Sequence, residues 1–128
     1  MEKYRKTEIL QIVEEEGVEF IRLQFTDMFG TLKNVAVPVS CLEKAMDDRC
    51  TIDLASLNGF AKEEETELYL KPDFSTFTIL PWRPQNGKVA RFLCDVCTEN
   101  GREYELSPRL ILKRALEKAE KQGYTLEV

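Results

Sequence analysis

The chain has 128 residues, the length of one domain, and a chain of this length can bury about two-thirds of its unfolded surface in a core of its own. An apolar share of 43% and a charged share of 32% argue against both a disordered chain and a membrane span. The formal net charge of −5, without a long basic run, argues against nucleic acid as a partner. Because the N-terminal residues lack the apolar stretch of a secretory signal, a cytoplasmic protein is expected. The sequence contains no histidine, so any chemistry rests on carboxylates, hydroxyls, lysines or thiols.

A helix and a pair of strands are predicted at the start of the chain. Apolar residues at helical spacing predict a helix over Thr7–Glu16, capped by its first residue and ended by Gly17. The period then changes to two, which predicts a strand over Val18–Thr26 and a partner strand over Leu32–Val39. Asp27–Gly30 is typical of the turn of such a hairpin.

A second helix is predicted after this hairpin. Ser40 and Glu43 have the spacing of a capping box, in which the serine hydroxyl accepts from the backbone N–H of Glu43 and the glutamate reaches back. The helix is expected to end near Asp48 and to be followed by a short strand over Cys50–Asp53.

The stretch Thr51–Leu70 is the one around which we expect the domain to be organised. It is too long and too irregular for a hairpin turn, and loops of more than about 12 residues in a compact domain are usually functional or disordered. Its apolar residues Leu54, Leu57 and Phe60 suit docking, and the acidic run Glu63–Glu65 follows them. The pattern indicates an interaction loop or an active-site loop.

Strand patterns return after this loop. Leu68–Leu70 and Thr76–Leu80 are predicted to be strands, with Lys71–Asp73 as a bend between them. Val89–Val96 is the most strand-like of the remaining runs.

The clearest helix of the sequence lies near its C-terminal end. Ser107 is a good N-cap, Pro108 suits the first helical position, and Gly123 is expected to end the helix. Its predicted inner stripe consists of Leu112, Ala115, Leu116 and Ala119, with Ile111 beside them. An alternating run begins at Tyr124, and we therefore expect the natural chain to continue past Val128.

The order of these elements predicts an α+β fold, a mixed β-sheet packed against helices. Five consecutive segments of the sequence resemble the N-terminal β-grasp domain of type I glutamine synthetase. They are Ile21–Ser40, Ile52–Phe60, Glu67–Trp82, Gly87–Val96 and Ser107–Tyr124. The resemblance implies a β-grasp domain over residues 1–106, and a helix with the truncated start of a C-terminal catalytic domain over residues 107–128.

The resemblance implies a part in glutamate–ammonia ligation, in which ATP phosphorylates the side-chain carboxylate of glutamate and ammonia displaces the phosphate. In that family the N-terminal domain of one subunit completes the active site of its neighbour. The implied partners are therefore the protein's own C-terminal catalytic domain, neighbouring identical subunits, and ammonium and glutamate at the shared site. ATP and Mg or Mn are expected in the C-terminal domain, so this domain is expected to bind no cofactor or metal and to be inactive alone.

Few site residues can be transferred from the family. The family's loop reads Phe-Asp-Gly-Ser-Ser-Ile, and its aspartate and second serine help to form the ammonium site; Asp53 and Ser56 fall on these positions. A carboxylate stabilises a cation and can accept a proton, and a hydroxyl can orient the cation. The sequence departs from the pattern with Leu54 for the glycine and Ala55 for the first serine. Lys62 falls where related enzymes carry an arginine near the bound product, which keeps the charge without the planar fork.

The cysteines support a different hypothesis. Cys41, Cys50, Cys94 and Cys97 could together hold a structural zinc ion, and the last two form a C-x-x-C motif. Chelation by that motif requires a turn, whereas the pattern predicts a strand there, and reduced thiols are the default in the cytoplasm.

A binding or regulatory module without ligase activity is the remaining alternative. The β-grasp fold occurs in proteins of unrelated function, so the fold alone does not determine the activity. Without the resemblance, Asp53 at the end of a strand would be interpreted as a turn or capping residue.

Overall fold

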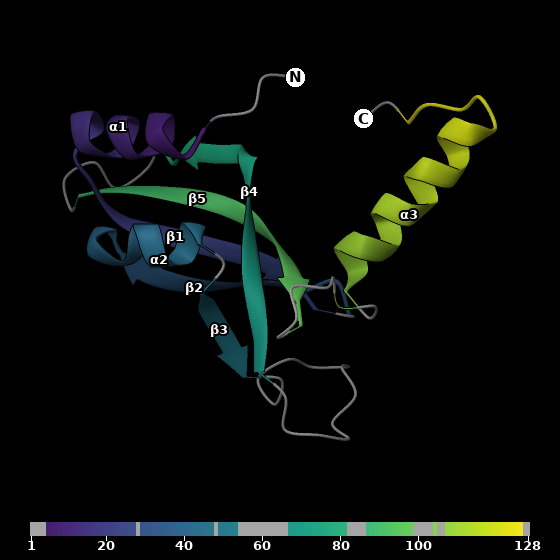
Figure 1. The fold of residues 1–128 in the computed structure, drawn as a ribbon, viewed down its shortest axis with the longest axis horizontal. Coiled ribbons are helices and arrows are strands. Elements are labelled where there is room, and N and C mark those ends of the chain that lie inside the picture. Colours follow the sequence, from purple (N-terminus) through teal and green to yellow (C-terminus); the bar gives the residue numbers. More distant parts are fainter. Residues whose placement is uncertain are drawn as a thin grey trace.

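The computed structural model describes residues 5–27, 29–47, 49–53, 67–81, 87–98, 104 and 107–126. In chain order its elements are α1 (Lys6–Glu16), β1 (Val18–Thr26), β2 (Leu32–Pro38), the 3₁₀ helix η1 (Val39–Cys41), α2 (Leu42–Met46), β3 (Cys50–Asp53), β4 (Glu67–Ile79), β5 (Lys88–Cys97) and α3 (Pro108–Lys121). The described strands form one sheet in the order β2-β1-β5-β4-β3 (Figure 1). Strands β1 and β5 pair in parallel, and the other neighbours pair antiparallel. The predicted α+β fold with a mixed sheet is therefore confirmed.

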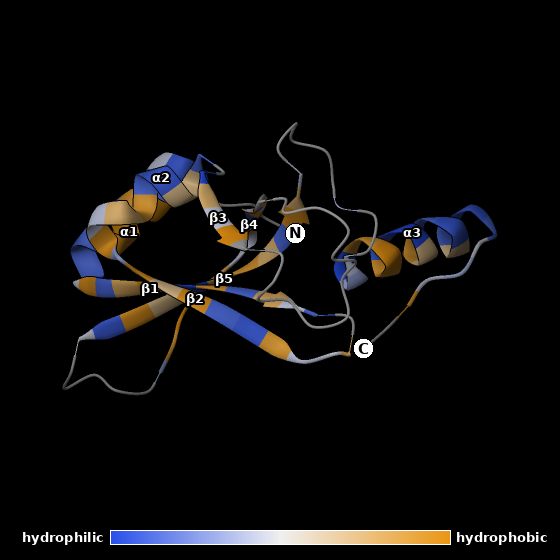
Figure 2. Cartoon of the chain, turned by 90° about the horizontal axis from the view of Figure 1, so that it is seen from below, coloured by the Kyte–Doolittle hydropathy of each residue, from blue (hydrophilic) through white to orange (hydrophobic). Residues whose placement is uncertain are grey.

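Helices α1 and α2 lie over the same face of the sheet (Figure 2). Each has an apolar side with buried residues, Ile9 and Val13 on α1 and Leu42 and Met46 on α2. These apolar side chains are shielded from water only when the helices pack against the sheet, so the hydrophobic effect holds both helices on this face. Helix α3 extends away from the sheet in both views (Figures 1 and 2).

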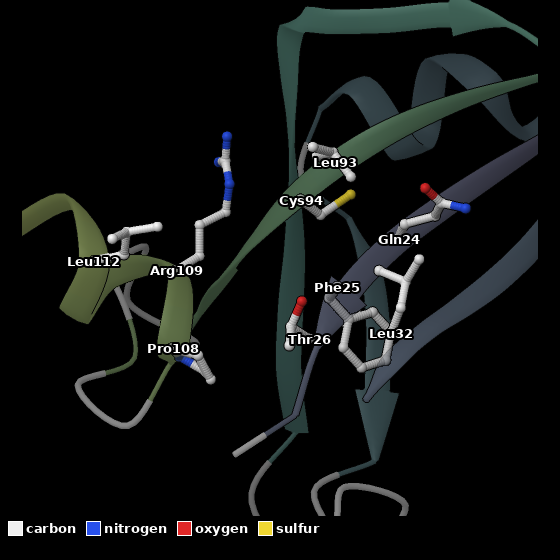
Figure 3. A pocket seen from close by; sticks show the side chains of 9 residues that line it. All are labelled: Gln24, Phe25, Thr26, Leu32, Leu93, Cys94, Pro108, Arg109 and Leu112. Carbon is white, nitrogen blue, oxygen red and sulfur yellow. The ribbon is translucent and has the colours of Figure 1, made fainter. Parts of the chain in front are cut away.

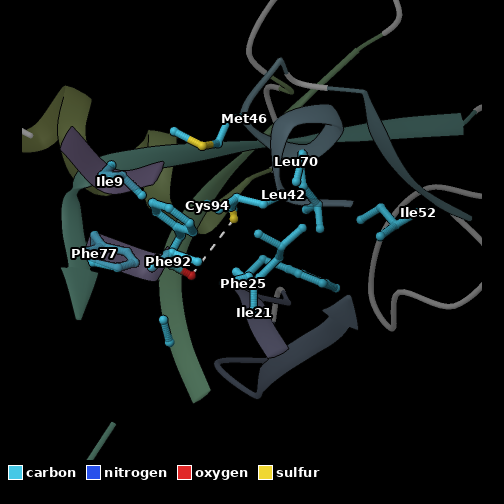
Figure 4. Packing of buried hydrophobic residues seen from close by; sticks show 14 of the residues in the cluster. Ile9, Ile21, Phe25, Leu42, Met46, Ile52, Leu70, Phe77, Phe92 and Cys94 are labelled. Carbon is cyan, nitrogen blue, oxygen red and sulfur yellow. Dashed lines mark hydrogen bonds between the residues drawn. The ribbon is translucent and has the colours of Figure 1, made fainter. Parts of the chain in front are cut away.

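The core lies between this face of the sheet and the two helices (Figure 4). The predicted alternation in β1 is confirmed, since Ile21, Leu23 and Phe25 are buried there. Phe92 of β5 is fully buried, and its ring centroid lies 5.3 Å from that of Phe77 and 6.0 Å from that of Phe74. These tilted aromatic contacts add to the burial of apolar area.

The helix starts differ from the sequence prediction. Helix α1 begins at Lys6 with Arg5 as N-cap, so Thr7 lies inside the helix and does not cap it. The capping box at Ser40 is also wrong, because Val39–Cys41 forms a 3₁₀ turn and moves the N-cap of α2 to Cys41, which makes no side-chain cap bond. The predicted end of α1 is confirmed: Gly17 has φ 68°, a left-handed conformation that costs glycine little.

Strand β4 is continuous, so the predicted bend at Lys71–Asp73 is wrong. Pro72 pairs with Cys94 within the ladder, and the register shift lies later, between Asp73 and Thr78. Strand β3 begins at Cys50, which lies opposite Leu70, so its pairing with β4 does not reach Pro72. Among the described strands, β4 therefore has a neighbour on one side only at Pro72, which is where a missing N–H is tolerated.

The register shift in β4 is stabilised by hydroxyl groups. The Thr76 hydroxyl donates to the Asp73 carbonyl at 2.6 Å and accepts from the Leu93 N–H at 2.8 Å. The Asp73 carboxylate accepts from both the N–H and the hydroxyl of Ser75. The side chains thus replace ladder bonds that the shift removes.

Helix α3 begins as predicted, with Ser107 as N-cap and Pro108 in the first turn, and it ends at Lys121, just before Gly123. Its predicted inner stripe is wrong for the described residues: Leu110 is the buried residue of α3, whereas Ile111 and Leu112 are 52% and 55% exposed. The alternating run that begins at Tyr124 does not form a strand over residues 124–126. None of the described helices has the length and apolar character that a bilayer crossing requires.

The turn between β1 and β2 depends on a buried carboxylate. Asp27 is 1% exposed, and its Oδ1 accepts from the backbone N–H groups of Phe29 and Thr31 at 2.9 Å each. The Lys33 ammonium lies 3.9 Å from the other oxygen. The carboxylate therefore satisfies donors that the turn leaves without a backbone partner.

We expect Asp27→Ala to lower the free energy of unfolding by about 1–3 kcal/mol, because it leaves two amides without their acceptor. Asp27→Asn is the matched control, since it keeps an oxygen acceptor and loses only the charge. Denaturant unfolding measures both variants. Equal losses would show that the charge next to Lys33, and not the pair of amide bonds, stabilises the turn.

Candidate functional site

The long stretch Thr51–Leu70 begins and ends as an antiparallel strand pair. Strands β3 and β4 pair from Cys50 opposite Leu70 to Asp53 opposite Glu67, so the stretch joins two antiparallel neighbours. The predicted loop between them falls on residues 54–66, which lie outside the described residues. Strand β3 is an edge strand of the sheet. Residues 54–66 therefore connect to the scaffold at this edge.

The predicted site residues are only partly covered by the structure. Asp53 is the last residue of β3, and its backbone is described while its side chain is not. Ser56 and Lys62 lie outside the described residues, as do Leu54 and Ala55. Ile52, directly before Asp53, is 6% exposed and belongs to the core cluster, so burial anchors the backbone up to the candidate carboxylate.

A cavity of about 300 Å³ lies between the sheet and the start of α3 (Figure 3). Its lining comes from β1, β2, β5 and α3 and includes Phe25, Leu32, Leu93 and Arg109. It also includes Cys94, but burial raises the pKa of that thiol far above its ordinary value, so the reactive thiolate is scarce. Among the described residues, the lining is thus suited to apolar contact and contains no base or nucleophile poised to react.

An ion-pair network beside this cavity connects α3 to the sheet. Arg109 donates to Asp95 Oδ1 of β5 and to Asp73 Oδ2 of β4, both at 2.9 Å. Lys113, one turn further along α3, donates to Asp95 Oδ2 at 2.8 Å. Sequence reasoning missed this network because no spacing signals a contact between residues 36 positions apart, such as Arg109 and Asp73.

Two groups of the network have shifted pKa values. Burial would raise the pKa of the Asp73 carboxyl, but hydrogen bonds from Ser75 and Arg109 outweigh burial and hold it below its ordinary value. Burial would lower the pKa of the Arg109 guanidinium, but the hydrogen bond to Asp73 and the charge of Asp95 raise it. Both groups are therefore charged at neutral pH.

We expect Arg109→Gln to destabilise the domain by about 1–2 kcal/mol at neutral pH and to loosen the first turn of α3. Because the pKa of Asp73 is lowered in the folded state, its contribution is complete above the ordinary aspartate pKa of about 3.9 and is lost as the pH falls through the lowered value. The difference between wild type and variant should therefore shrink in acid. Denaturant unfolding at several pH values and hydrogen exchange of α3 measure these effects. If the stability difference between wild type and Arg109→Gln stayed constant as the pH was lowered, the assigned ion pair between Arg109 and Asp73 would be contradicted.

The described structure does not favour the alternative of a structural zinc ion held by the cysteines. Strand β5 continues through both Cys94 and Cys97, so the turn that chelation by this motif requires is absent, and both thiols are buried. Within the described part of the chain, no group of three or more cysteine, aspartate or glutamate side chains is arranged to hold a metal ion.

The described strand order, with antiparallel pairs on both sides of the parallel pair β1–β5, defines a β-grasp domain. The family model described as "Glutamine synthetase, beta-Grasp domain" matches residues 17–99. The chain belongs to the glutamine synthetase family, as the β-grasp domain of that family.

Curated relatives agree with this assignment. A glutamine synthetase of Clostridium saccharobutylicum is 52% identical over 128 residues, which is 100% of this chain and 29% of the relative. A glutamine synthetase of Staphylococcus epidermidis is 48% identical over 95% of this chain and 27% of its own length. The chain thus spans less than a third of the relatives that it matches.

Solved structures share the fold. The cryo-EM structure of Plasmodium falciparum glutamine synthetase superposes with a TM-score of 0.80 over 96% of this chain and 24% of that chain, at 22% identity. A GmaS in complex with ADP superposes with a TM-score of 0.76 over 91% of this chain and 26% of that chain, at 26% identity. Both show that this arrangement of sheet and helices recurs as one part of a longer chain.

Proposed function

We propose that the chain is the N-terminal domain of an ATP-dependent glutamate–ammonia ligase and contributes to glutamine biosynthesis in the cytoplasm. The observation that carries this proposal is the match of the whole chain, at 52% identity, to 29% of the length of a relative named glutamine synthetase. We infer that residues 1–106 form the β-grasp domain and that residues 107–128 begin the catalytic domain.

The domain's contribution is the loop that follows β3. Asp53 is placed where the anchored strand ends, and Ser56 follows it in the sequence. A carboxylate near ammonium favours the charged cation, and it can accept a proton as ammonia becomes the nucleophile. A hydroxyl can hold the cation in one orientation. We assign these two roles to Asp53 and Ser56, and a contact to bound substrate or product to Lys62.

The loop acts in the active site of a neighbouring identical subunit, and the chain's own catalytic domain is its second partner. ATP and Mg or Mn bind outside residues 1–128 in this proposal. The edge position of β3 supports such sharing, since Asp53, its last residue, lies at the border of the sheet and not at its centre. The ammonium site is then complete only in the assembled protein.

Activity of the full-length protein and of residues 1–128 tests the proposal. ADP release from ATP is measured with glutamate and ammonium together and with each omitted. We expect release that requires both substrates in the full-length protein, and none from residues 1–128 alone. Release that is independent of ammonium, or no release from the folded full-length protein, would favour a binding or regulatory module.

A further inference from the structure

Two half-buried thiols line a cavity that is separate from the one beside the α3 network. A cavity of about 200 Å³ is lined by Val37, Cys41, Lys44, Ala45, Cys50 and Thr51. Val37 belongs to β2 and Thr51 to β3, and these strands are the two edges of the sheet. Because residues of both edges line one cavity beneath α2, the sheet must be curled. The curl thus brings together residues that the flat strand order separates.

The two thiols lie at opposite ends of one segment. Cys41 is the N-cap residue of α2, and Cys50 is the first residue of β3. Both are half-buried, whereas Cys94 and Cys97 are 2% and 3% exposed in the core. Within the described residues, the thiols that a dissolved reagent can reach from this cavity are therefore Cys41 and Cys50.

A cation accompanies the thiols. Lys44 lines the same cavity, and among the described residues its ammonium forms no ion pair. Burial raises the pKa of the Cys50 thiol, the Lys44 charge opposes this rise, and Cys41 adds to it. All three groups therefore lie close enough to influence one another, and the site favours an anionic reactant.

We propose that Cys41 and Cys50 form a thiol–disulfide exchange site that reacts with an anionic low-molecular-weight disulfide and is converted to an intrachain disulfide. The inference stands on the cavity, the two thiols and Lys44, and it is independent of the ligase function.

The chemistry takes two exchange steps. The thiolate of Cys41 attacks one sulfur of the small disulfide, a protein–reagent S–S bond forms, and one thiolate leaves with the electron pair of the broken bond. The thiolate of Cys50 then attacks the Cys41 sulfur, forms the Cys41–Cys50 bond and releases the second small thiolate. The two thiol protons pass to solvent or to the leaving thiolates. Two protein thiols are oxidised and one small disulfide is reduced to two thiols.

The order of attack follows from the environment. A raised pKa leaves Cys50 with little thiolate, which makes it a slow first nucleophile. After Cys41 carries the mixed disulfide, the reaction with Cys50 is intramolecular, and proximity compensates for the scarce thiolate. Eight residues lie between the two cysteines, so the new bond closes a short loop around α2.

Peptide mapping after oxidation tests the proposal. The reduced full-length protein is incubated with oxidised glutathione, quenched by alkylation and mapped by mass spectrometry without reduction. We expect one crosslinked peptide that joins Cys41 to Cys50. Cys50→Ser should accumulate glutathione on Cys41, and Cys41→Ser should react at least about tenfold more slowly than wild type.

The charge of Lys44 supplies a second, independent readout. Lys44→Gln should slow the reaction with anionic oxidised glutathione about fivefold and should not slow the reaction with cationic cystamine. Cys94→Ser is the matched control and should leave all rates unchanged. Three results would overturn the proposal. One is oxidation of Cys41→Ser at the wild-type rate, and another is a crosslink to Cys94 or Cys97. The third is a wild-type protein in which Cys41 still carries glutathione while Cys50 stays reduced.

Discussion

Asp53→Ala in the full-length protein is expected to lower kcat/KM for ammonium by about 10- to 100-fold, with little change in the KM for ATP. The expected size is that of one lost interaction with a charged group, about 1.5–3 kcal/mol. Asp53→Asn should show a smaller loss of kcat/KM for ammonium, because asparagine keeps an oxygen acceptor but not the charge. Steady-state kinetics with ammonium and ATP varied separately measure both effects.

Asp47→Ala is the matched control for Asp53→Ala. Asp47 is also an aspartate, and it pairs with Lys6 and Arg49 on the exposed surface after α2. Its removal should leave the kinetics unchanged. An Asp53→Ala enzyme with the wild-type dependence on ammonium would remove the carboxylate from the ammonium site.

Phe92→Ala should lower the free energy of unfolding by about 3–5 kcal/mol, the largest stability loss that we expect from one side chain. Phe92 is 0% exposed and packs on Phe74 and Phe77, so truncation removes apolar burial and leaves a cavity that these rings fill only in part. Denaturant unfolding measures the loss.

Phe29→Ala is the control for Phe92→Ala, because Phe29 is 75% exposed. It should change stability by no more than about 0.5 kcal/mol. Phe92→Leu should lie between the two, since it keeps much of the apolar volume. Similar losses for Phe92→Ala and Phe29→Ala would contradict the position of the core.

The sequence predicted correctly those elements whose hydrophobic pattern matches the faces that are buried and exposed in the fold. Strand β1 was predictable because one of its faces is buried, so that Ile21, Leu23 and Phe25 alternate with polar residues. Gly17 marked the end of α1 because the chain needs a positive φ there. Both features depend on residues close together in the sequence, so they could be predicted from it.

The errors arose where tertiary structure overrides local chemistry. Pro72 suggested a break, but β4 has an open side at that point and the ladder continues. Ser40 and Glu43 had capping-box spacing, but a 3₁₀ turn occupies that position. The apolar stripe of α3 suggested a packed helix, yet Ile111 and Leu112 are exposed among the described residues.

The candidate site was predictable only through resemblance to the family. Asp53 is one aspartate at the end of a strand, and neither spacing nor periodicity distinguishes it from a turn residue. The Arg109–Asp73 pair and the shared position of Cys41 and Cys50 depend on contacts that only the folded chain creates. Their signals were absent from the sequence because contact partners far apart in the chain carry no fixed spacing.

Transfer of isotopic nitrogen tests the central claim most directly. The full-length protein is supplied with ¹⁵N-ammonium, glutamate and ATP, and the products are analysed by mass spectrometry. We predict glutamine that carries ¹⁵N in its side-chain amide, formed in step with ADP. ADP without labelled glutamine, or neither product from the folded protein, would contradict a glutamate–ammonia ligase.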